Sequence, residues 1–267
     1  MRIVHVLAAL LALALAAAGA AAQQGISPPP AAPPDSTPLQ DRPGITTLPL
    51  PADPAGAVVL IFNHGTNRPQ FRHVCNEGRD IPGVVRDLAA THGWLVHYLC
   101  SVVTDENEPG SYTYKRADEI LAAAAAYRAK GVPARGIFLL GHSAGGWSSL
   151  MAARKDPSGF NAVIAFAPAF AGTRAEAVQY PQWRGEFAPR QIAYLRQAKR
   201  IDALILAYSD DSFDRPEDLA PLESIPGLRI LAFDVCGAGH GTTYTECFCT
   251  GARVEIEDYL KQRLAQP

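Results

Sequence analysis

Short apolar runs alternate with longer amphipathic segments along most of the chain. Six runs are almost continuously apolar, as in strands buried on both faces of a sheet, and they span residues 57–62, 94–100, 136–140, 161–167, 203–208 and 228–235. Helical patterns follow most of them, at residues 84–92, 114–130, 147–154, 189–200 and 255–264. This alternation predicts an α/β fold of one domain, with helices on both faces of a mostly parallel central sheet.

The N-terminal segment lacks this alternation. A positive start at Met1-Arg2 precedes the apolar segment 3–18, and small residues follow it up to Ala22. This order is typical of a secretory signal peptide, and the apolar run falls short of the ~20 residues that cross a bilayer comfortably. An uncleaved membrane anchor is the alternative.

The segment that follows is rich in Pro, Ala, Ser and Thr, which is typical of a flexible or polyproline tether. We therefore expect a signal peptide over residues 1–22, a tether over residues 23–54 and the folded domain over residues 55–267. A signal peptide implies a periplasmic or secreted protein.

The composition is that of an ordinary globular protein. The 267 residues are 48% hydrophobic and 19% charged, with a formal net charge of -2, which suffices to bury one large core. Nucleic-acid binding needs clustered Lys and Arg, and here these residues are scattered. We therefore expect no nucleic-acid partner and, after signal cleavage, no membrane partner. The oligomeric state stays open.

Five cysteines allow at most two disulfides within one chain. Cys75 with Cys100 would tie together two loops near strand ends. Cys236 with either Cys247 or Cys249 would bracket a loop that carries a histidine. A zinc site is not expected, because the last two cysteines have C-x-C spacing and no second ligand pair stands at zinc-site spacing.

The segment Gly141–Gly145 has the pattern G-x-S-x-G, with Ser143 at its centre. It follows a predicted strand and precedes a predicted helix, which is the setting of a nucleophile elbow. In that turn the Ala144 amide lies at a helix N-terminus, where it can donate to a developing oxyanion. A chance glycine-rich turn is the alternative.

A nucleophilic serine needs a general base, and His240 is the single histidine that follows Ser143 in the chain. A carboxylate must orient that imidazole. The loop after the fifth predicted strand offers three, of which Asp211 is preferred because it lies three or four residues past the strand. Asp210 and then Asp214 are the alternatives.

A second oxyanion donor is expected in the loop after the first predicted strand. That strand ends in the segment Asn63–Thr66, which contains a His-Gly pair. Gly65 allows the chain to turn back, the Thr66 amide is the expected donor, and His64 braces the loop.

These motifs, in this order along the chain, resemble the α/β-hydrolase superfamily, over roughly residues 57–264. The resemblance is closest to the dienelactone-hydrolase-like branch and to the polyester- and feruloyl-esterase-like branch. Dienelactone hydrolases proper use a cysteine nucleophile, so the serine favours ordinary ester chemistry. The resemblance implies hydrolysis through an acyl-enzyme, with no metal ion or organic cofactor.

Substrate pockets on this fold are built by inserted loops. Residues 64–82, 101–114 and 168–200 are the expected walls, and Tyr112 and Trp183 are the expected substrate-binding residues. The preferred partner is a small-molecule carboxylic ester with an aromatic or carbohydrate portion. A serine peptidase of the same fold, or a secreted binding module without catalytic activity, are the alternatives.

Overall fold

The computed structural model describes residues 49, 51–65, 75–101, 103 and 110–266. All of them lie in the compact unit formed by residues 31–267. The expected signal peptide and nearly all of the expected tether lie outside the described residues.

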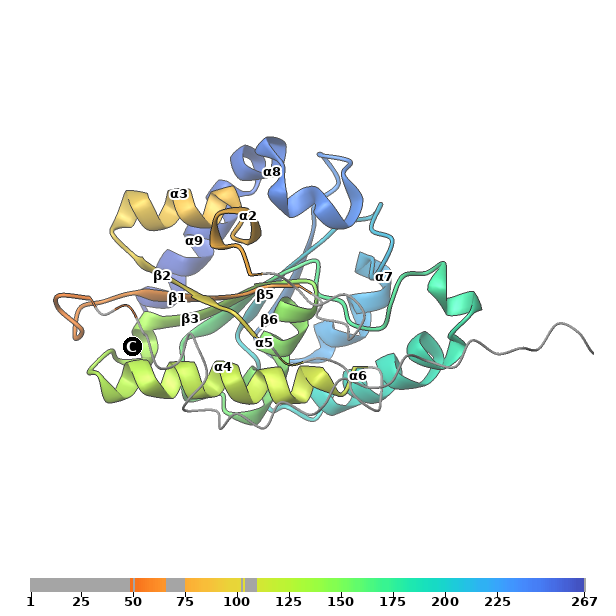
Figure 1. Cartoon of the computed structure of the whole chain (residues 1–267), viewed down its shortest axis with the longest axis horizontal. Coiled ribbons are helices and arrows are strands. Elements are labelled where there is room, and N and C mark those ends of the chain that lie inside the picture. Colours follow the sequence, from red (N-terminus) through yellow and green to blue (C-terminus); the bar gives the residue numbers. More distant parts are fainter. Residues whose placement is uncertain (1–48, 50, 66–74, 102, 104–109, 267) are drawn as a thin grey trace, which may run out of the picture. The chain divides into compact units, whose positions relative to one another are not determined.

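The centre of the fold is one sheet of six parallel strands in the order β2-β1-β3-β4-β5-β6 (Figure 1). Four of the strands are buried along their whole length, which explains why their sequences are almost continuously apolar. The strands are β1 (Val59–Asn63), β2 (Leu95–Leu99), β3 (Ile137–His142), β4 (Ala162–Phe166), β5 (Ala203–Ala207) and β6 (Leu228–Ala232). The predicted α/β fold with a parallel central sheet is confirmed.

Helices cover both faces of this sheet (Figure 1). Side chains of β1 alternate between the two cores, with Val59 and Ile61 on one face and Leu60 and Phe62 on the other. The first core is closed by α4 (Tyr112–Ala129), α5 (Ala144–Lys155) and α6 (Ala188–Arg196). The second is closed by α3 (Gly83–His92), α8 (Glu246–Gly251) and α9 (Arg253–Leu264).

Short helical segments were not predicted, because a segment of one or two turns shows no amphipathic repeat. Three are α-helical, α2 (Glu77–Asp80), α7 (Pro216–Leu219) and α8, and Trp183–Phe187 forms a π-helix. The remaining segments are 3-10 helices, namely Ala134–Gly136, Glu176–Val178, Ala220–Ser224 and Gly239–Tyr244. The loop expected to present His240 is therefore a 3-10 helix.

The chain reverses its direction across the sheet at β1. It leaves β1 through α3 to reach β2 on one side, and it returns through α4 on the opposite face to reach β3 on the other side. Open α/β sheets bind ligands at such a switch point, in the crevice outside the carboxyl ends of the strands. Asn63 pairs with Gly141 in the register of β1 and β3. The residues that follow these two strands therefore meet at this crevice.

The structure joins Cys75 to Cys100 and Cys236 to Cys247 in disulfides, and it leaves Cys249 as a free thiol. Both pairings lie within the expected set, and the structure selects Cys247 over Cys249. Among the described residues, no helix combines the length and the apolar character that a membrane crossing requires.

Candidate active site

Ser143 occupies a strained turn between β3 and α5. Its backbone has φ 54° and ψ −125°, which a residue with a side chain adopts at a cost of about 1–3 kcal/mol. Two hydrogen bonds hold it there: its N–H donates to the Phe166 carbonyl over 2.9 Å, and the Trp147 N–H donates to its carbonyl over 3.0 Å. The strand–turn–helix setting expected for a nucleophile elbow is present.

Glycines make this turn possible, because the backbone segments around it approach too closely for side chains. A Cβ atom added to Gly141 would lie 2.4 Å from the Gly145 carbonyl carbon. One added to Gly145 would lie 2.2 Å from the Asn63 carbonyl oxygen. The pattern G-x-S-x-G therefore reflects the packing of α5 against β1 and β3, as well as the turn itself.

His240 is held by a buried carboxylate. Its Nδ1 lies 2.8 Å and 3.1 Å from the two carboxylate oxygens of Asp211, which is 0% exposed. The Phe213 N–H also donates to this carboxylate over 2.7 Å, and the Phe213 ring lies 4.2 Å from the imidazole. Because an ionised carboxylate only accepts hydrogen bonds, Nδ1 carries the proton, and Nε2 of the neutral ring is an acceptor.

The two alternative acids have other partners. Asp210 accepts a hydrogen bond of 2.8 Å from the Gly239 N–H, so it fixes the backbone beside His240 rather than the imidazole. Asp214 forms an ion pair of 2.8 Å with Arg184. Burial raises the pKa of Asp214 to about 6, in spite of the neighbouring guanidinium. Of the three candidates, the structure brings Asp211 to the imidazole.

His142 connects the serine turn to the histidine segment. Its Nε2–H donates to the His240 carbonyl over 2.9 Å, and the centroids of the two rings are 4.7 Å apart. Burial, together with the neighbouring His240, lowers the pKa of His142 to about 3, so its ring is neutral at neutral pH. The Tyr244 ring contacts the same imidazole, at 5.0 Å.

Within the described part of the chain, neither the Ser143 hydroxyl nor His240 Nε2 has a hydrogen-bond partner. His240 Nε2 is shielded from solvent and has no hydrogen-bond partner in the described part of the chain. Ser143 is 4% exposed, and among the described residues no recorded hydrogen bond involves its hydroxyl. Catalytic hydrogen bonds are often long before substrate binds and tighten in the complex.

One of the two expected oxyanion donors lies within the described residues. Ala144 is the first residue of α5, so its N–H has no partner inside the helix and lies at the positive end of the helix dipole. Thr66 lies outside the described residues. Gly65, which precedes it, reaches the nucleophile: a Cβ atom added to Gly65 would lie 3.5 Å from Ser143 Cβ.

The two residues expected to bind substrate occupy different environments. Tyr112 is 1% exposed and belongs to the core between the sheet and α4, so it offers almost no surface to a substrate. Trp183 is half-buried, stacks on Tyr180 with centroids 4.2 Å apart, and covers Gly172. Sequence reasoning missed Phe213 and Tyr244, whose only signal is that each lies two to four residues after an expected catalytic residue.

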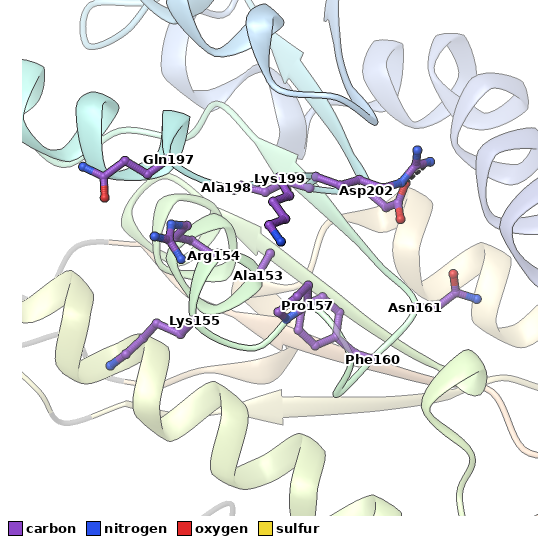
Figure 2. Close-up of a pocket in the computed structure, with 12 residues that line it drawn as sticks. Ala153, Arg154, Lys155, Pro157, Phe160, Asn161, Gln197, Ala198, Lys199 and Asp202 are labelled. Atoms are coloured by element: carbon purple, nitrogen blue, oxygen red, sulfur yellow. Dashed lines mark hydrogen bonds and ion pairs between the residues drawn. The ribbon is translucent and has the colours of Figure 1, made fainter.

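A cavity of about 590 Å³ lies at the opposite edge of the sheet (Figure 2). It opens beside Asn161 and Asp202, which directly precede β4 and β5, whereas Ser143 follows the carboxyl end of β3. Three of its four basic side chains already have partners: Lys155 with Asp118, Arg200 with Asp202, and Arg154 on the Tyr194 ring. The cavity holds none of the expected catalytic residues.

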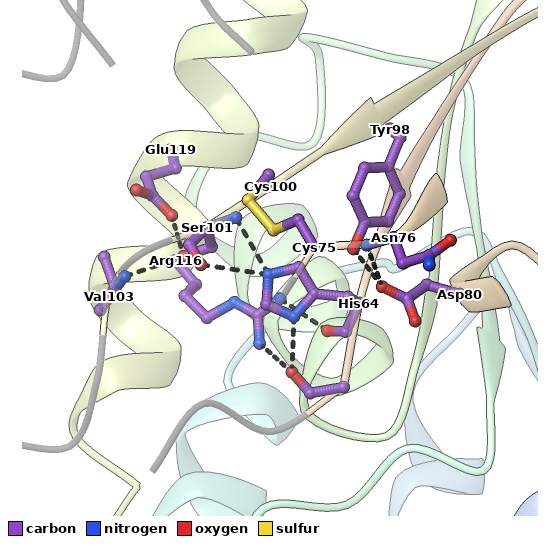
Figure 3. The surroundings of a disulfide bond; sticks show 11 residues. His64, Cys75, Asn76, Asp80, Tyr98, Cys100, Ser101, Val103, Arg116 and Glu119 are labelled. Atoms are coloured by element: carbon purple, nitrogen blue, oxygen red, sulfur yellow. Dashed lines mark hydrogen bonds between the residues drawn. A yellow bond between two sulfur atoms is a disulfide. The ribbon is translucent and has the colours of Figure 1, made fainter. Parts of the chain in front are cut away.

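One cluster of metal-ligating residue types occurs among the described residues. The ligand atoms of His64, Cys75 and Cys100 lie within 4.8 Å of one another. The two sulfur atoms are bonded to each other, and both imidazole nitrogens of His64 lie within hydrogen-bond distance of backbone atoms (Figure 3). In this oxidised state the cluster has no thiolate to offer a metal ion.

Comparison with known proteins supports the fold and an esterase-like resemblance. Residues 102–215, less than half of the chain, match the family model described as "Putative esterase". Est1E from Butyrivibrio proteoclasticus is similar in structure, with a TM-score of 0.55 and 16% identity over 80% of this chain and 91% of that one. A second Est1E structure, with ferulic acid bound, has the same TM-score and 15% identity, over 80% of this chain and 92% of that one.

Dipeptidyl peptidase 4 of Porphyromonas gingivalis is also similar, with a TM-score of 0.54 and 19% identity over 79% of this chain. The match covers 32% of that peptidase, so this chain spans about a third of its length. Curated protein sequences gave no significant match. The α/β-hydrolase fold and the esterase-like resemblance are confirmed.

Proposed function

We propose that this protein is a serine hydrolase that cleaves a carboxylic ester through an acyl-enzyme intermediate. One observation carries the proposal: a serine in a strained turn at the switch point of the sheet, joined through His142 to an imidazole that a buried carboxylate orients. Strain of this kind persists only where the surrounding structure maintains it, and it gathers at functional sites.

The proposed mechanism uses the Ser143 hydroxyl and His240 Nε2. His240 Nε2 accepts the Ser143 proton while the serine oxygen attacks the ester carbonyl, and Asp211 stabilises the resulting imidazolium. The Ala144 and Thr66 amides hold the oxyanion. His240 then protonates the leaving alcohol, and a water molecule activated by the same histidine releases the acid.

A small or medium ester with an aromatic portion is the proposed substrate class. Two aromatic rings flank the reactive residues: Phe213 lies on the His240 ring, and Tyr244, which is 42% exposed, lies against His142. The aromatic acid bound in one of the Est1E structures supports the same class. Trp183 stacks on Tyr180, and the next residue, Arg184, pairs with Asp214 in the loop that carries Asp211.

The likeness to dipeptidyl peptidase 4 favours a serine peptidase as the second candidate function. Both candidates use the same nucleophile and base, so the substrates that the protein turns over distinguish an esterase from a peptidase. An esterase hydrolyses p-nitrophenyl esters and leaves peptide p-nitroanilides intact, whereas a peptidase cleaves both. A binding module without catalytic activity would turn over neither.

We also propose that the protein is exported, with residues 1–22 removed as a signal peptide. The two disulfides support an oxidising compartment. N-terminal sequencing of the mature protein tests this proposal. A mature chain that still begins at Met1 would contradict it.

The decisive experiment measures turnover of p-nitrophenyl esters, from acetate to decanoate, by the chain without residues 1–22. We expect Ser143→Ala to lower kcat by roughly 10⁴-fold or more. Ser158→Ala is the matched control, because Ser158 is exposed and its hydroxyl bonds Asp156 in a loop after α5. Full activity of the Ser143→Ala variant would end the proposal.

A further inference from the structure

The segment that carries His240 is rich in glycine. It forms the 3-10 helix Gly239–Tyr244, and its backbone has positive φ angles of 58° at Gly237 and 55° at Gly239. Glycine loses more conformational freedom on folding than any other residue. The direction of the His240 imidazole therefore depends on contacts between this segment and the rest of the protein.

Contacts from the ends of two strands hold the segment. From the loop after β5, the Asp211 carboxylate lies 2.8 Å from His240 Nδ1, and the Asp210 carboxylate accepts from the Gly239 N–H over 2.8 Å. From the end of β3, the His142 Nε2–H donates to the His240 carbonyl over 2.9 Å. Of these three contacts, the one from His142 comes from the turn that carries the proposed nucleophile.

The place of His142 in the chain gives this hydrogen bond its consequence. His142 is the last residue of β3 and directly precedes Ser143. A bond from its side chain to the His240 backbone therefore restrains the distance between the segments that carry the proposed nucleophile and base. The two aspartates restrain this distance less directly, because both of them follow β5.

The His142 ring is itself held in place. The residue is 8% exposed, and its ring centroid lies 4.7 Å from that of His240 and 5.0 Å from that of Tyr244. A Cβ atom added to Gly65 would lie 3.6 Å from its Nδ1. Burial, and then the neighbouring His240, lower the pKa of His142 to about 3. At neutral pH its N–H thus donates without placing a second positive charge beside the imidazolium formed during the reaction.

We propose that His142 is a positioning residue for the general base. By holding the His240 carbonyl, it keeps the His240 imidazole directed at the Ser143 hydroxyl. This inference rests on the proposed function, because the imidazole needs this direction only if it takes a proton from the serine. If His142 only stabilised the fold, its replacement would lower stability and leave the turnover of the folded enzyme unchanged.

The test compares three replacements of His142. The amide nitrogen of glutamine can take the place of Nε2, that of asparagine stops short of the His240 carbonyl, and phenylalanine keeps a ring without a donor. We expect His142→Asn and His142→Phe to lower kcat for a p-nitrophenyl ester roughly 10- to 100-fold with KM within about twofold, because a displacement of about 1 Å can cost about 10²-fold. His142→Gln should stay within about threefold of the wild type.

Two results of this comparison would overturn the inference. One is a wild-type kcat in folded His142→Asn or His142→Phe, of which the second serves where the first does not fold. The other is a glutamine variant as slow as the asparagine variant, because the restored N–H would then have no effect.

Thr243→Val is the matched control. Thr243 lies in the same 3-10 helix as His240, is 1% exposed, and its hydroxyl forms a hydrogen bond with the Tyr208 hydroxyl. The substitution removes one buried hydrogen bond of this helix and leaves the His142 bond in place. We expect it to lower Tm and to leave kcat within about twofold of the wild type. A loss as large as that of His142→Asn would contradict a specific role for His142.

A double variant tests whether His142 acts through the His240 imidazole. His240→Ala removes the imidazole and keeps the backbone carbonyl. Residues that act as a unit have non-additive effects, so we expect His142→Asn to cause no further loss in the residual hydrolysis of p-nitrophenyl acetate by His240→Ala. Losses that multiply would mean that His142 acts independently of the base, and would overturn the inference.

The wild type separates the two proposals. If it neither hydrolyses esters nor reacts with a fluorophosphonate probe, the proposed function fails. If it does both and the His142 variants match it, only the role of His142 fails.

Discussion

The two edges of the sheet differ in what their polar residues are bonded to. At the carboxyl edge, Asp211, His142 and Arg116 are buried, and each bonds a neighbouring segment of the site. At the amino edge the structure has a cavity of about 590 Å³, and three of its four basic side chains pair with a local carboxylate or a ring. The proposed function therefore rests on buried, directed hydrogen bonds and backbone strain, and not on the size of a cavity.

The substitution Asp211→Asn, at the carboxyl edge, should cause the largest loss of activity. An amide in place of the carboxylate favours the wrong tautomer of His240, so we expect kcat to fall roughly 10⁴-fold. Asp214→Asn is the control, since Asp214 lies three residues away and pairs with Arg184, and it should change kcat less than tenfold. Steady-state kinetics on both variants measure this. If the two variants lost kcat equally, the whole loop, and not Asp211 alone, would orient His240.

Removal of the Cys75–Cys100 disulfide tests how much this bond at the carboxyl edge contributes to the stability of the protein. The two cysteines are 25 residues apart, and closing a loop of that length stabilises a fold by about 3–4 kcal/mol in the chain-entropy model. We expect the double variant Cys75→Ala/Cys100→Ala to lose stability of that order in urea unfolding. Cys249→Ala, which removes the free thiol, should stay within about 0.5 kcal/mol of the wild type. A disulfide variant as stable as Cys249→Ala would contradict this.

Because the His142 ring is neutral in the fold, we expect the stability of the folded protein to fall in acid. Its pKa is about 3 in the fold, below its value of 6.5 in the unfolded chain, so the unfolded chain binds more protons between these values. Its contribution is therefore fully present above pH 6.5 and is lost as the pH falls toward 3, by about 1 kcal/mol per pH unit. His142→Gln keeps an N–H donor without the titration. The difference in stability between wild type and variant should shrink or reverse between pH 7.5 and pH 5, and a constant difference would refute it.

Substitutions at the amino edge should have the smallest effect. Lys199→Ala and Arg154→Ala remove basic side chains from the wall of the large cavity. Because the cavity lies at the edge opposite Ser143, we expect kcat/KM for p-nitrophenyl esters to stay within twofold of the wild type. A loss of tenfold or more in either variant would mean that the cavity takes part in catalysis.

Much of the fold could be predicted because its signals are local. Buried parallel strands such as β4 and β5 are apolar at every position, and the glycines around Ser143 are required by close backbone contacts. The contact of Asp211 with His240 could also be anticipated, because both follow neighbouring strands of the sheet. Local patterns were thus enough for the architecture and for the residues proposed as a triad.

The remaining features depend on tertiary contacts that no local pattern reveals. Arg116 lies in an Ala-rich helix, where an arginine is usually exposed, and its burial depends on hydrogen bonds to the carbonyls of His64 and Gly65, 52 and 51 residues earlier. His142 meets the His240 carbonyl across a separation of 98 residues. Tyr112 was expected in a pocket wall, yet it lies in the core because α4 begins there and packs its first turn against the sheet.

Mapping the site of covalent modification by a fluorophosphonate probe tests the central claim most directly. After labelling at neutral pH, peptide mass spectrometry should place a single adduct on Ser143, and the rate of labelling should fall sharply in His240→Ala while the Ser158→Ala control labels like the wild type. An adduct on another residue, or labelling of Ser143 at the same rate without His240, would contradict the proposed pairing of these two side chains.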